Sequence, residues 1–177
     1  MTKLLDTVLL LALPASGKSE VRKYLDGISA KVCQQDFHMG ATVQLDDYPY
    51  VHFMHRIDDE MAKRGQPYVF YKGPKRPFID GFEWGTLVHM LNEDFADLQA
   101  QRTVSPASPA QWLLDRLDNA HEKVDLPRAL GEVPYRIRCE IADVMDEEVA
   151  PELEYRNKIC SEGLEGKTVV IEAARGG

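Results

Sequence analysis

The feature that most limits the fold is a continuous apolar run at 7–13, TVLLLAL, which is followed at once by Pro14 and small residues. A run without polar alternation is typical of a strand that is buried on both faces, as in the centre of a parallel sheet. Proline and the small residues favour a turn. From Gly17 onward the spacing is helical, so the segment predicts a buried parallel strand, a loop and a helix.

The loop between this strand and helix has the sequence of a phosphate-binding segment. It resembles a Walker A loop, GxxxxGK[ST], with alanine at the first glycine position. The resemblance implies that loop N–H groups bind the phosphates of ATP, that Lys18 reaches the β- and γ-phosphates, and that Ser19 is a ligand of Mg²⁺. A chance GKS after an apolar strand is the alternative. The implied nucleotide-binding residues are Ala12, Pro14, Ala15, Ser16, Gly17, Lys18 and Ser19.

A pair of acids follows a second, shorter strand pattern at 42–45. In open parallel sheets, ligands bind beyond the carboxyl ends of the strands. Here the chain resembles P-loop kinases of the nucleoside and nucleotide kinase group, whose uridine kinase-like members carry an acid and then an aromatic residue after the second strand. The resemblance implies that Asp46 orients or deprotonates an acceptor hydroxyl, with Asp47 as its substitute and Tyr48 in the acceptor pocket. Equally, the two aspartates could cap a helix that begins near Pro49.

A third acid ends the strand pattern at 168–171. This strand and Glu172 resemble a Walker B strand, which implies that Glu172 binds Mg²⁺ through water or orders the nucleophile. Arg175 could contact a phosphate or be solvated. The segment 36–38, Asp-Phe-His, repeats the order of acid and aromatic residue, but no clear strand precedes it, so it ranks second to Asp46.

The rest of the chain is mostly helical in pattern. Apolar residues at helical spacing predict helices from Pro49 to about residue 65, over 84–98, after Ser108 and over 135–162. Within the last of these, Pro151 predicts a kink or a break. The residues at 68–71, YVFY, are strand-like.

Strands that alternate with helices predict an α/β fold with a parallel sheet. We expect a three-layer parallel sheet of P-loop NTPase type with a helical insertion. Residues 1–81 and 163–177 would form the nucleotide-binding core, and 82–162 the insertion or acceptor-binding cap. The resemblance also implies a further strand or two and an arginine-bearing lid, which this sequence does not supply. The chain therefore resembles the N-terminal part of a longer kinase, weakly active or inactive in isolation.

Composition narrows the possible partners and compartments. The chain is 44% hydrophobic and 28% charged, which is typical of a folded globular protein. A net charge of -8 argues against nucleic acid or an anionic membrane as the main partner. Three widely spaced cysteines without a CxxC favour a reducing cytoplasm over a disulfide framework. The apolar run near the N-terminus imitates a signal peptide, but it is short and follows Asp6 directly.

Other charged residues have simple interpretations. Lys72, Lys75 and Arg76 form a basic loop that could grip an anionic acceptor, although a solvated loop is the commoner explanation. His52 and His55 are three residues apart but lack a third metal ligand nearby. The acidic residues in 143–148 are expected on a solvated helix face.

Together these patterns predict an ATP- and Mg²⁺-dependent phosphotransferase that acts on a small hydroxyl- or phosphate-bearing molecule. The implied catalytic residues are Lys18, Asp46 and Asp47, and the implied metal ligands are Ser19 and Glu172. Two alternatives stay open: a nucleotide-binding ATPase module that acts through conformational change, and a non-catalytic interaction protein with a vestigial loop. The sequence leaves the acceptor, the nucleotide base and the oligomeric state open.

Overall fold

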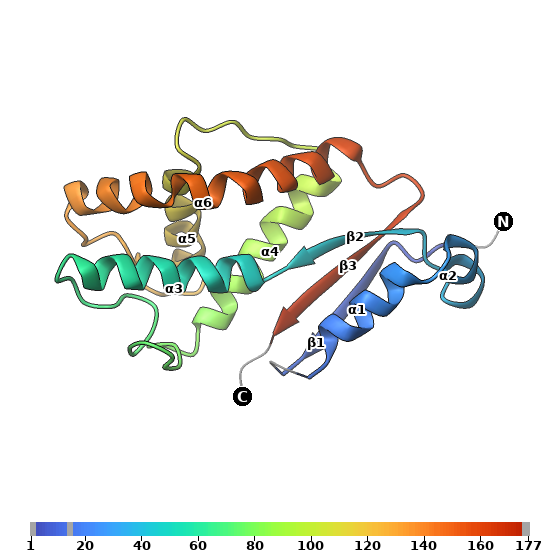
Figure 1. The fold of residues 1–177 in the computed structure, drawn as a ribbon, viewed down its shortest axis with the longest axis horizontal. Coiled ribbons are helices and arrows are strands. Elements are labelled where there is room, and N and C mark those ends of the chain that lie inside the picture. Colours follow the sequence, from blue (N-terminus) through green and yellow to red (C-terminus); the bar gives the residue numbers. More distant parts are fainter. Residues whose placement is uncertain (1–2, 14–15, 175–177) are drawn as a thin grey trace.

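The computed structural model describes residues 3–13 and 16–174. Figure 1 shows two parts: a parallel sheet with short helices beside it, and a lobe built from longer helices. The elements along the chain are β1 (Thr7–Ala12), α1 (Lys18–Gly27), α2 (Ala30–Asp36), β2 (Ala41–Asp46), α3 (Tyr48–Lys63), α4 (Glu83–Gln99), α5 (Pro109–Glu122), α6 (Tyr135–Glu162) and β3 (Lys167–Ala174).

The sheet confirms the predicted α/β class. Within the described residues it has three strands in the order β1-β3-β2, and both pairs are parallel. The register places Glu172 opposite Leu10 on one side and opposite Asp46 on the other. Since all three strands run the same way, their carboxyl ends meet at one edge of the sheet.

Side chains of β3 alternate between two helical layers. Val169 and Ala173 pack against α4 and α6, together with Val43 and Leu45 of β2. Val170 faces the other way, toward α1 and α2. This period of two is what a pleated strand requires when helices cover both of its faces. The central strand of the sheet is therefore β3, and the arrangement has three layers.

The expectation that β1 is buried on both faces is wrong for the described residues. Leu9 and Leu11 are 58% and 51% exposed, whereas Val8 and Leu10 pack toward α1 and α2. This face of β1 is exposed because α4 and α6, the helices on that side of the sheet, pack over β2 and β3. On the described chain, β1 pairs with β3 alone and lies at an edge of the sheet.

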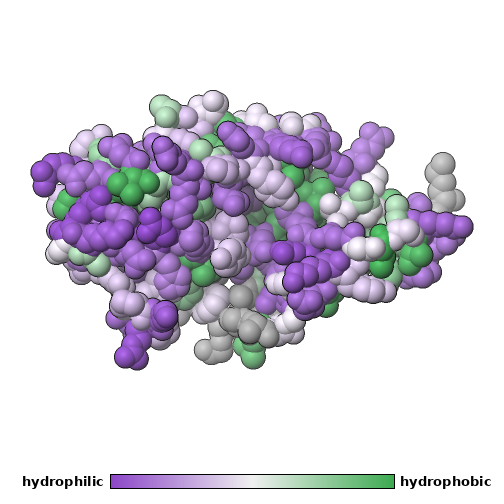
Figure 2. Space-filling model, viewed as in Figure 1, coloured by the Kyte–Doolittle hydropathy of each residue, from purple (hydrophilic) through white to green (hydrophobic). Residues whose placement is uncertain are grey.

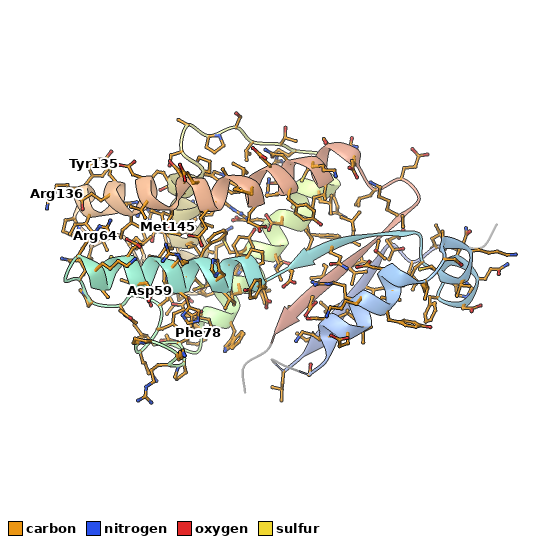
Figure 3. All side chains as sticks on the ribbon, in the orientation of Figure 1. Asp59, Arg64, Phe78, Tyr135, Arg136 and Met145 are labelled. Atoms are coloured by element: carbon orange, nitrogen blue, oxygen red, sulfur yellow. The ribbon has the colours of Figure 1, made fainter. Side chains whose placement is uncertain are left out.

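The largest hydrophobic core lies in the helical lobe. It joins side chains from α3 to side chains from α4, α5 and α6, so α3 packs within the same core as the helices of the expected insertion at 82–162. Figure 3 shows Met145 between α6 and α3, where it is fully buried. The division of the chain into domains stays a prediction.

The predicted strand at 68–71 does not form. Three successive backbone N–H groups of this segment donate to the carboxylate of Asp58, at 2.8–3.3 Å. The carboxylate thus takes the donors that a neighbouring strand would have used. Only an isolated antiparallel bridge joins Tyr71 to Phe78.

Helix α6 is not broken at its proline, and one of its acidic residues has structural partners. It continues from Tyr135 to Glu162 without a break at Pro151. The acidic segment 143–148 is not simply a solvated face, because Asp146 accepts hydrogen bonds from Ser108 Oγ and the Ala110 N–H, both at 2.8 Å. Asp146 thereby joins α6 to the start of α5.

The two histidines of α3 have structural partners. His52 Nε2 lies 2.6 Å from Glu148 Oε1 of α6, and His55 stacks on Tyr71 with ring centroids 3.7 Å apart. Among the described residues, no group of three or more histidine, cysteine or acidic side chains could hold a metal ion.

The surface over α3 and α6 is mostly hydrophilic, and hydrophobic residues gather near the junction of α1 and α2 (Figure 2). Within the described part of the chain, none of the helices has the length and apolar character needed to cross a membrane.

Gly40, just before β2, lies close to the backbone of Gly166, so a substitution at Gly40 can test how the strands pack. A Cβ atom at this position would lie 2.0 Å from the carbonyl oxygen of Gly166. We expect Gly40→Ala to lower the free energy of unfolding by about 1–3 kcal/mol, because the strands must separate to accept the methyl group. Urea denaturation checks this. Gly27→Ala, where nothing lies within 4 Å, is the control and should shift stability by less than about 0.5 kcal/mol. Equal effects of the two substitutions would contradict this packing.

Candidate functional site

The loop after β1 leads directly into α1. Gly17 has φ 89° and ψ 11°, a left-handed conformation that glycine adopts without steric cost, and α1 begins at Lys18. The Lys18 ammonium donates to the carbonyl oxygen of Leu13, at 3.1 Å. The N-terminal end of α1, which carries the positive end of the helix dipole, therefore lies at the carboxyl edge of the sheet.

Two of the predicted metal ligands meet at this edge. Ser19 Oγ donates to Glu172 Oε1 at 3.2 Å, although the residues are 153 positions apart. Glu172 is buried, and its second carboxylate oxygen, Oε2, has no hydrogen-bond partner among the described residues. The first turn of α1 is thus joined to the neighbouring strand, and Glu172 Oε2 accepts no hydrogen bond from the described residues but lies 3.5 Å from Arg22 Nη1.

Arg22 joins Ser19 and Glu172 to Asp46, the acid predicted to face the acceptor. Its Nη1 atom lies 2.9 Å from Asp46 Oδ2 and 3.5 Å from Glu172 Oε2. The sequence interpretation did not include Arg22. The signal was present, because Ser19 and Arg22 are three residues apart and so share a face of α1.

The same face of α1 continues along β2. Asp26, one turn beyond Arg22, accepts hydrogen bonds from Thr42 Oγ1 at 3.0 Å and from Gln44 Nε2 at 3.1 Å. Alternate residues of β2 therefore point to α1, and Asp46 is the last of them. This ladder of contacts fixes where the carboxylate of Asp46 lies.

Asp46 also contacts the start of α3. Its Oδ1 atom accepts a hydrogen bond from the Tyr48 N–H, at 2.8 Å, in a local turn that satisfies one backbone donor of this helix. The N-cap residue itself is Asp47, which makes no side-chain capping hydrogen bond, and its N–H donates to the carbonyl oxygen of Glu172 at 3.3 Å. The aspartate pair thus precedes α3 directly, while Asp46 also lies beside the loop.

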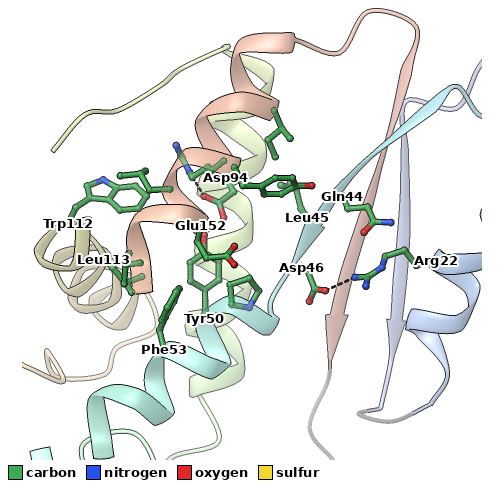
Figure 4. Close-up of a pocket in the computed structure, with 16 residues that line it drawn as sticks. Arg22, Gln44, Leu45, Asp46, Tyr50, Phe53, Asp94, Trp112, Leu113 and Glu152 are labelled. Atoms are coloured by element: carbon green, nitrogen blue, oxygen red, sulfur yellow. Dashed lines mark hydrogen bonds and ion pairs between the residues drawn. The ribbon is translucent and has the colours of Figure 1, made fainter. Parts of the chain in front are cut away.

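A cavity of about 210 Å³ opens beside Asp46, between β2 and the helical lobe. Figure 4 shows Asp46 and Arg22 on its sheet side and Trp112, Leu113 and Phe53 across from them. The lining residues are Arg22, Gln44, Leu45, Asp46, Pro49, Tyr50, Phe53, Asp94, Trp112, Leu113, Val149, Glu152, Leu153, Tyr155, Arg156 and Ile159. Arg22 lines the cavity and contacts Glu172, which accepts a hydrogen bond from Ser19, so Arg22 and Glu172 link the cavity to the loop before α1.

A buried polar network closes one side of the cavity. Asp94 of α4 accepts hydrogen bonds from Tyr50 of α3, Arg116 of α5 and Arg156 of α6, the two arginine contacts at 2.8 Å. Burial works against the charge of Arg156, but its hydrogen bond to Asp94 and the charge of Asp94 outweigh it and raise the guanidinium pKa. Burial is also the main reason that the pKa of Tyr50 is raised, so this phenol stays neutral.

Several predicted site residues lie elsewhere. Tyr48 is 67% exposed and does not line the cavity beside Asp46. The segment 36–38 follows α2 and precedes β2, so it lies at the amino end of the sheet, away from the loop. This position rules it out as the equivalent of Asp46. Lys72, Lys75 and Arg76 are exposed and line no part of this cavity.

The remaining predicted nucleotide-binding residues are described only in part. Ala12 pairs in register with Ala174 at the ends of β1 and β3. The Ser16 N–H donates to the carbonyl oxygen of Leu13 at 3.3 Å. Pro14, Ala15 and Arg175 lie outside the described residues.

Comparisons with protein-family models, with curated proteins and with solved structures found no match.

The double contact of Arg22 predicts a measurable loss on its removal. We expect Arg22→Met to lower the free energy of unfolding by about 1–3 kcal/mol, because it leaves the carboxylates of Glu172 and Asp46 without a cation. Lys23→Met is the matched control, since Lys23 contacts only the exposed Glu20 and should change stability by less than about 0.5 kcal/mol. Urea denaturation of both variants checks this, and equal midpoints would refute the role of Arg22.

Proposed function

We propose that this chain binds ATP with Mg²⁺ at the loop 12–19 and transfers the γ-phosphoryl group to a small acceptor beside Asp46. The observation that carries the proposal is the hydrogen bond from Ser19 Oγ to Glu172 Oε1. It joins the residue that follows Lys18 in the Walker A-like loop to the acid at the end of the adjacent parallel strand, as a shared Mg²⁺ site requires.

The residues at this site suit Mg²⁺. Glu172 Oε2 is a buried carboxylate oxygen without a hydrogen-bond partner among the described residues, and the Ser19 hydroxyl lies beside the same carboxylate. Mg²⁺ prefers oxygen ligands and usually takes only one or two from the protein, the rest coming from water and nucleotide phosphates. When bound, Mg²⁺ would neutralise charge on the β- and γ-phosphates.

The chain's own residues would hold the phosphates in line with the acceptor. The N-terminal end of α1 attracts the anionic phosphates, and Lys18 leaves the carbonyl of Leu13 to bind them. Arg22 contacts both Glu172 and Asp46, so it keeps the phosphate site and the acceptor site at a fixed separation.

The proposed transfer uses Asp46 at the acceptor. The acceptor oxygen bonds to the γ-phosphorus while the bond from this phosphorus to the β–γ bridging oxygen breaks, and ADP leaves with that electron pair. The hydroxyl proton passes to the carboxylate of Asp46 and then to solvent. Asp46 lines the cavity, which gives the acceptor its place.

One observation favours a second candidate, a nucleotide-binding ATPase module that acts through conformational change. Both carboxylate oxygens of Asp46 already accept a hydrogen bond, one from Arg22 and one from the Tyr48 N–H. An aspartate bound in this way would act as a structural link between α1 and α3. ATP turnover that no acceptor stimulates would support this second function.

Nucleotide binding depends on Lys18 in both candidate functions. We expect Lys18→Ala to weaken the binding of ATP with Mg²⁺ by about ten- to a hundredfold, because a charged hydrogen bond to phosphate is lost. Isothermal titration calorimetry checks this. Lys23→Ala, on the same helix but paired with Glu20, should bind ATP as the parent does. Undiminished binding by Lys18→Ala would contradict a role for this loop, and failure of the parent chain itself to bind ATP with Mg²⁺ would support the non-catalytic interaction protein.

Acceptor chemistry depends on Asp46. In a screen of nucleosides, sugars, cofactors and antibiotics, we expect at least one acceptor to stimulate ADP formation. Asp46→Asn should then lower kcat by about a hundred- to ten-thousandfold with ATP binding unchanged, because the proton acceptor is lost. Asp26→Asn is the matched control. Asp26 of α1 accepts hydrogen bonds from β2 but does not line the cavity, so this variant should keep its kcat. Unchanged phosphotransfer in Asp46→Asn would remove this residue from its role.

A further inference from the structure

The walls of the cavity beside Asp46 are mainly apolar and aromatic. Phe53, Trp112 and Tyr155 line it, together with aliphatic side chains from β2 and α6. Burial, the largest cause, raises the pKa of the Tyr155 phenol, so Tyr155 offers a neutral hydroxyl. Aromatic walls of this kind favour a flat ring, which loses apolar contact with water and stacks on the side chains.

The charges on the lining disfavour an anion. Arg22 is already paired with Asp46 and Glu172, and Arg156 is paired with Asp94 and Asp97. Each guanidinium therefore faces two carboxylates before any ligand enters. A phosphate group in this cavity would meet cations whose charge is already balanced.

Glu152 adds a negative charge at the exposed side of the cavity. It lines the cavity from α6 and forms no ion pair among the described residues. In Figure 4 its carboxylate lies between Trp112 and Asp46. A second negative charge on a ligand would be repelled from this position.

One buried donor on the lining lacks a partner. Arg156 is 7% exposed, and its Nη1 atom has no hydrogen-bond partner among the described residues, while Nε and Nη2 bind Asp94 and Asp97. Buried donors are nearly always paired in native proteins. Nη1 is itself enclosed by the protein, and the guanidinium lies over the ring of Trp112, 5.4 Å from Cζ to the ring centroid, so Arg156 is part of the wall and is not presented to a ligand as a cation.

We propose that this cavity is the acceptor site, and that it takes an uncharged, ring-bearing hydroxyl compound in preference to a phosphorylated one. The ring lies between the apolar and aromatic walls that include Phe53, Trp112 and Tyr155. The hydroxyl to be phosphorylated faces Asp46. That this ligand is a phosphate acceptor rests on the proposed phosphotransfer. Its binding to the cavity does not require nucleotide.

Matched pairs of probes test the preference. Uridine and pyridoxine are uncharged hydroxyl compounds with a ring, and uridine 5′-monophosphate and pyridoxine 5′-phosphate carry the added charge. The full chain with Trp84→Phe keeps Trp112 as its only tryptophan, whose fluorescence reports on the cavity. In the absence of nucleotide, we expect at least one uncharged probe to quench this fluorescence, and to bind at least about tenfold more tightly than its phosphate ester.

Two substitutions on α6 separate the effect of charge from general changes. Glu152→Lys should improve binding of the phosphate ester by about tenfold, because it replaces a repelling charge with an attracting one. Glu154→Lys is the matched control, since Glu154 is exposed on the same helix and does not line the cavity.

The outcomes distinguish this inference from the proposed function. Failure of every ring-bearing probe, tighter binding of the phosphate esters, or equal effects of Glu152→Lys and Glu154→Lys would overturn the inference. Lys18→Ala in the Trp84→Phe chain should bind the uncharged probes as the parent does. Binding of those probes by a chain that does not bind ATP would sustain the cavity and refute the kinase.

Discussion

The carboxylate of Asp94 holds the helical lobe together. It lies on α4 and accepts hydrogen bonds from Tyr50 of α3, Arg116 of α5 and Arg156 of α6, so one buried group contacts every other helix of the lobe. A buried ionic network of this kind adds little net stability over an apolar core, but removal of one member typically costs about 3–5 kcal/mol. It therefore specifies how the four helices are arranged more than how stable they are.

This arrangement also shapes the cavity. Tyr50, Asp94 and Arg156 all line it, and Arg116 lies against the ring of Trp112 with 4.6 Å from Cζ to the ring centroid. The rigid network thus supplies one wall, and β2 supplies the other. A wall fixed by hydrogen bonds to three neighbouring helices can hold a ligand in a defined orientation.

A second ionic cluster connects the sheet to this wall. Arg22 contacts Asp46 and Glu172, and Ser19 contacts Glu172, so α1, β2 and β3 meet through side chains at the carboxyl edge of the sheet. Asp46 also accepts a hydrogen bond from the Tyr48 N–H at the start of α3, the helix that carries Tyr50 into the helical lobe. The first turn of α1 is therefore connected to the cavity through a short series of ionic contacts and hydrogen bonds.

The sequence predicted the parts of the structure that depend on local order. The strand, loop and helix around Gly17, the helices with strong apolar spacing and the strand predicted at 168–171, which the structure extends to 167–174, follow from contacts near in sequence or from simple periodicity. It also indicated that Asp46 and Glu172 lie at one edge, since parallel strands place their ends together. What only the tertiary structure decided depends on partners far apart in the chain. Asp58 took the N–H groups that would have made 68–71 a strand, and α4 and α6 covered β2 and β3 but left one face of β1 exposed. Side-chain hydrogen bonds and packing between distant segments carry no periodic signal, so the two carboxylate partners of Arg22, the Asp94 network and the cavity emerged only when the chain was folded.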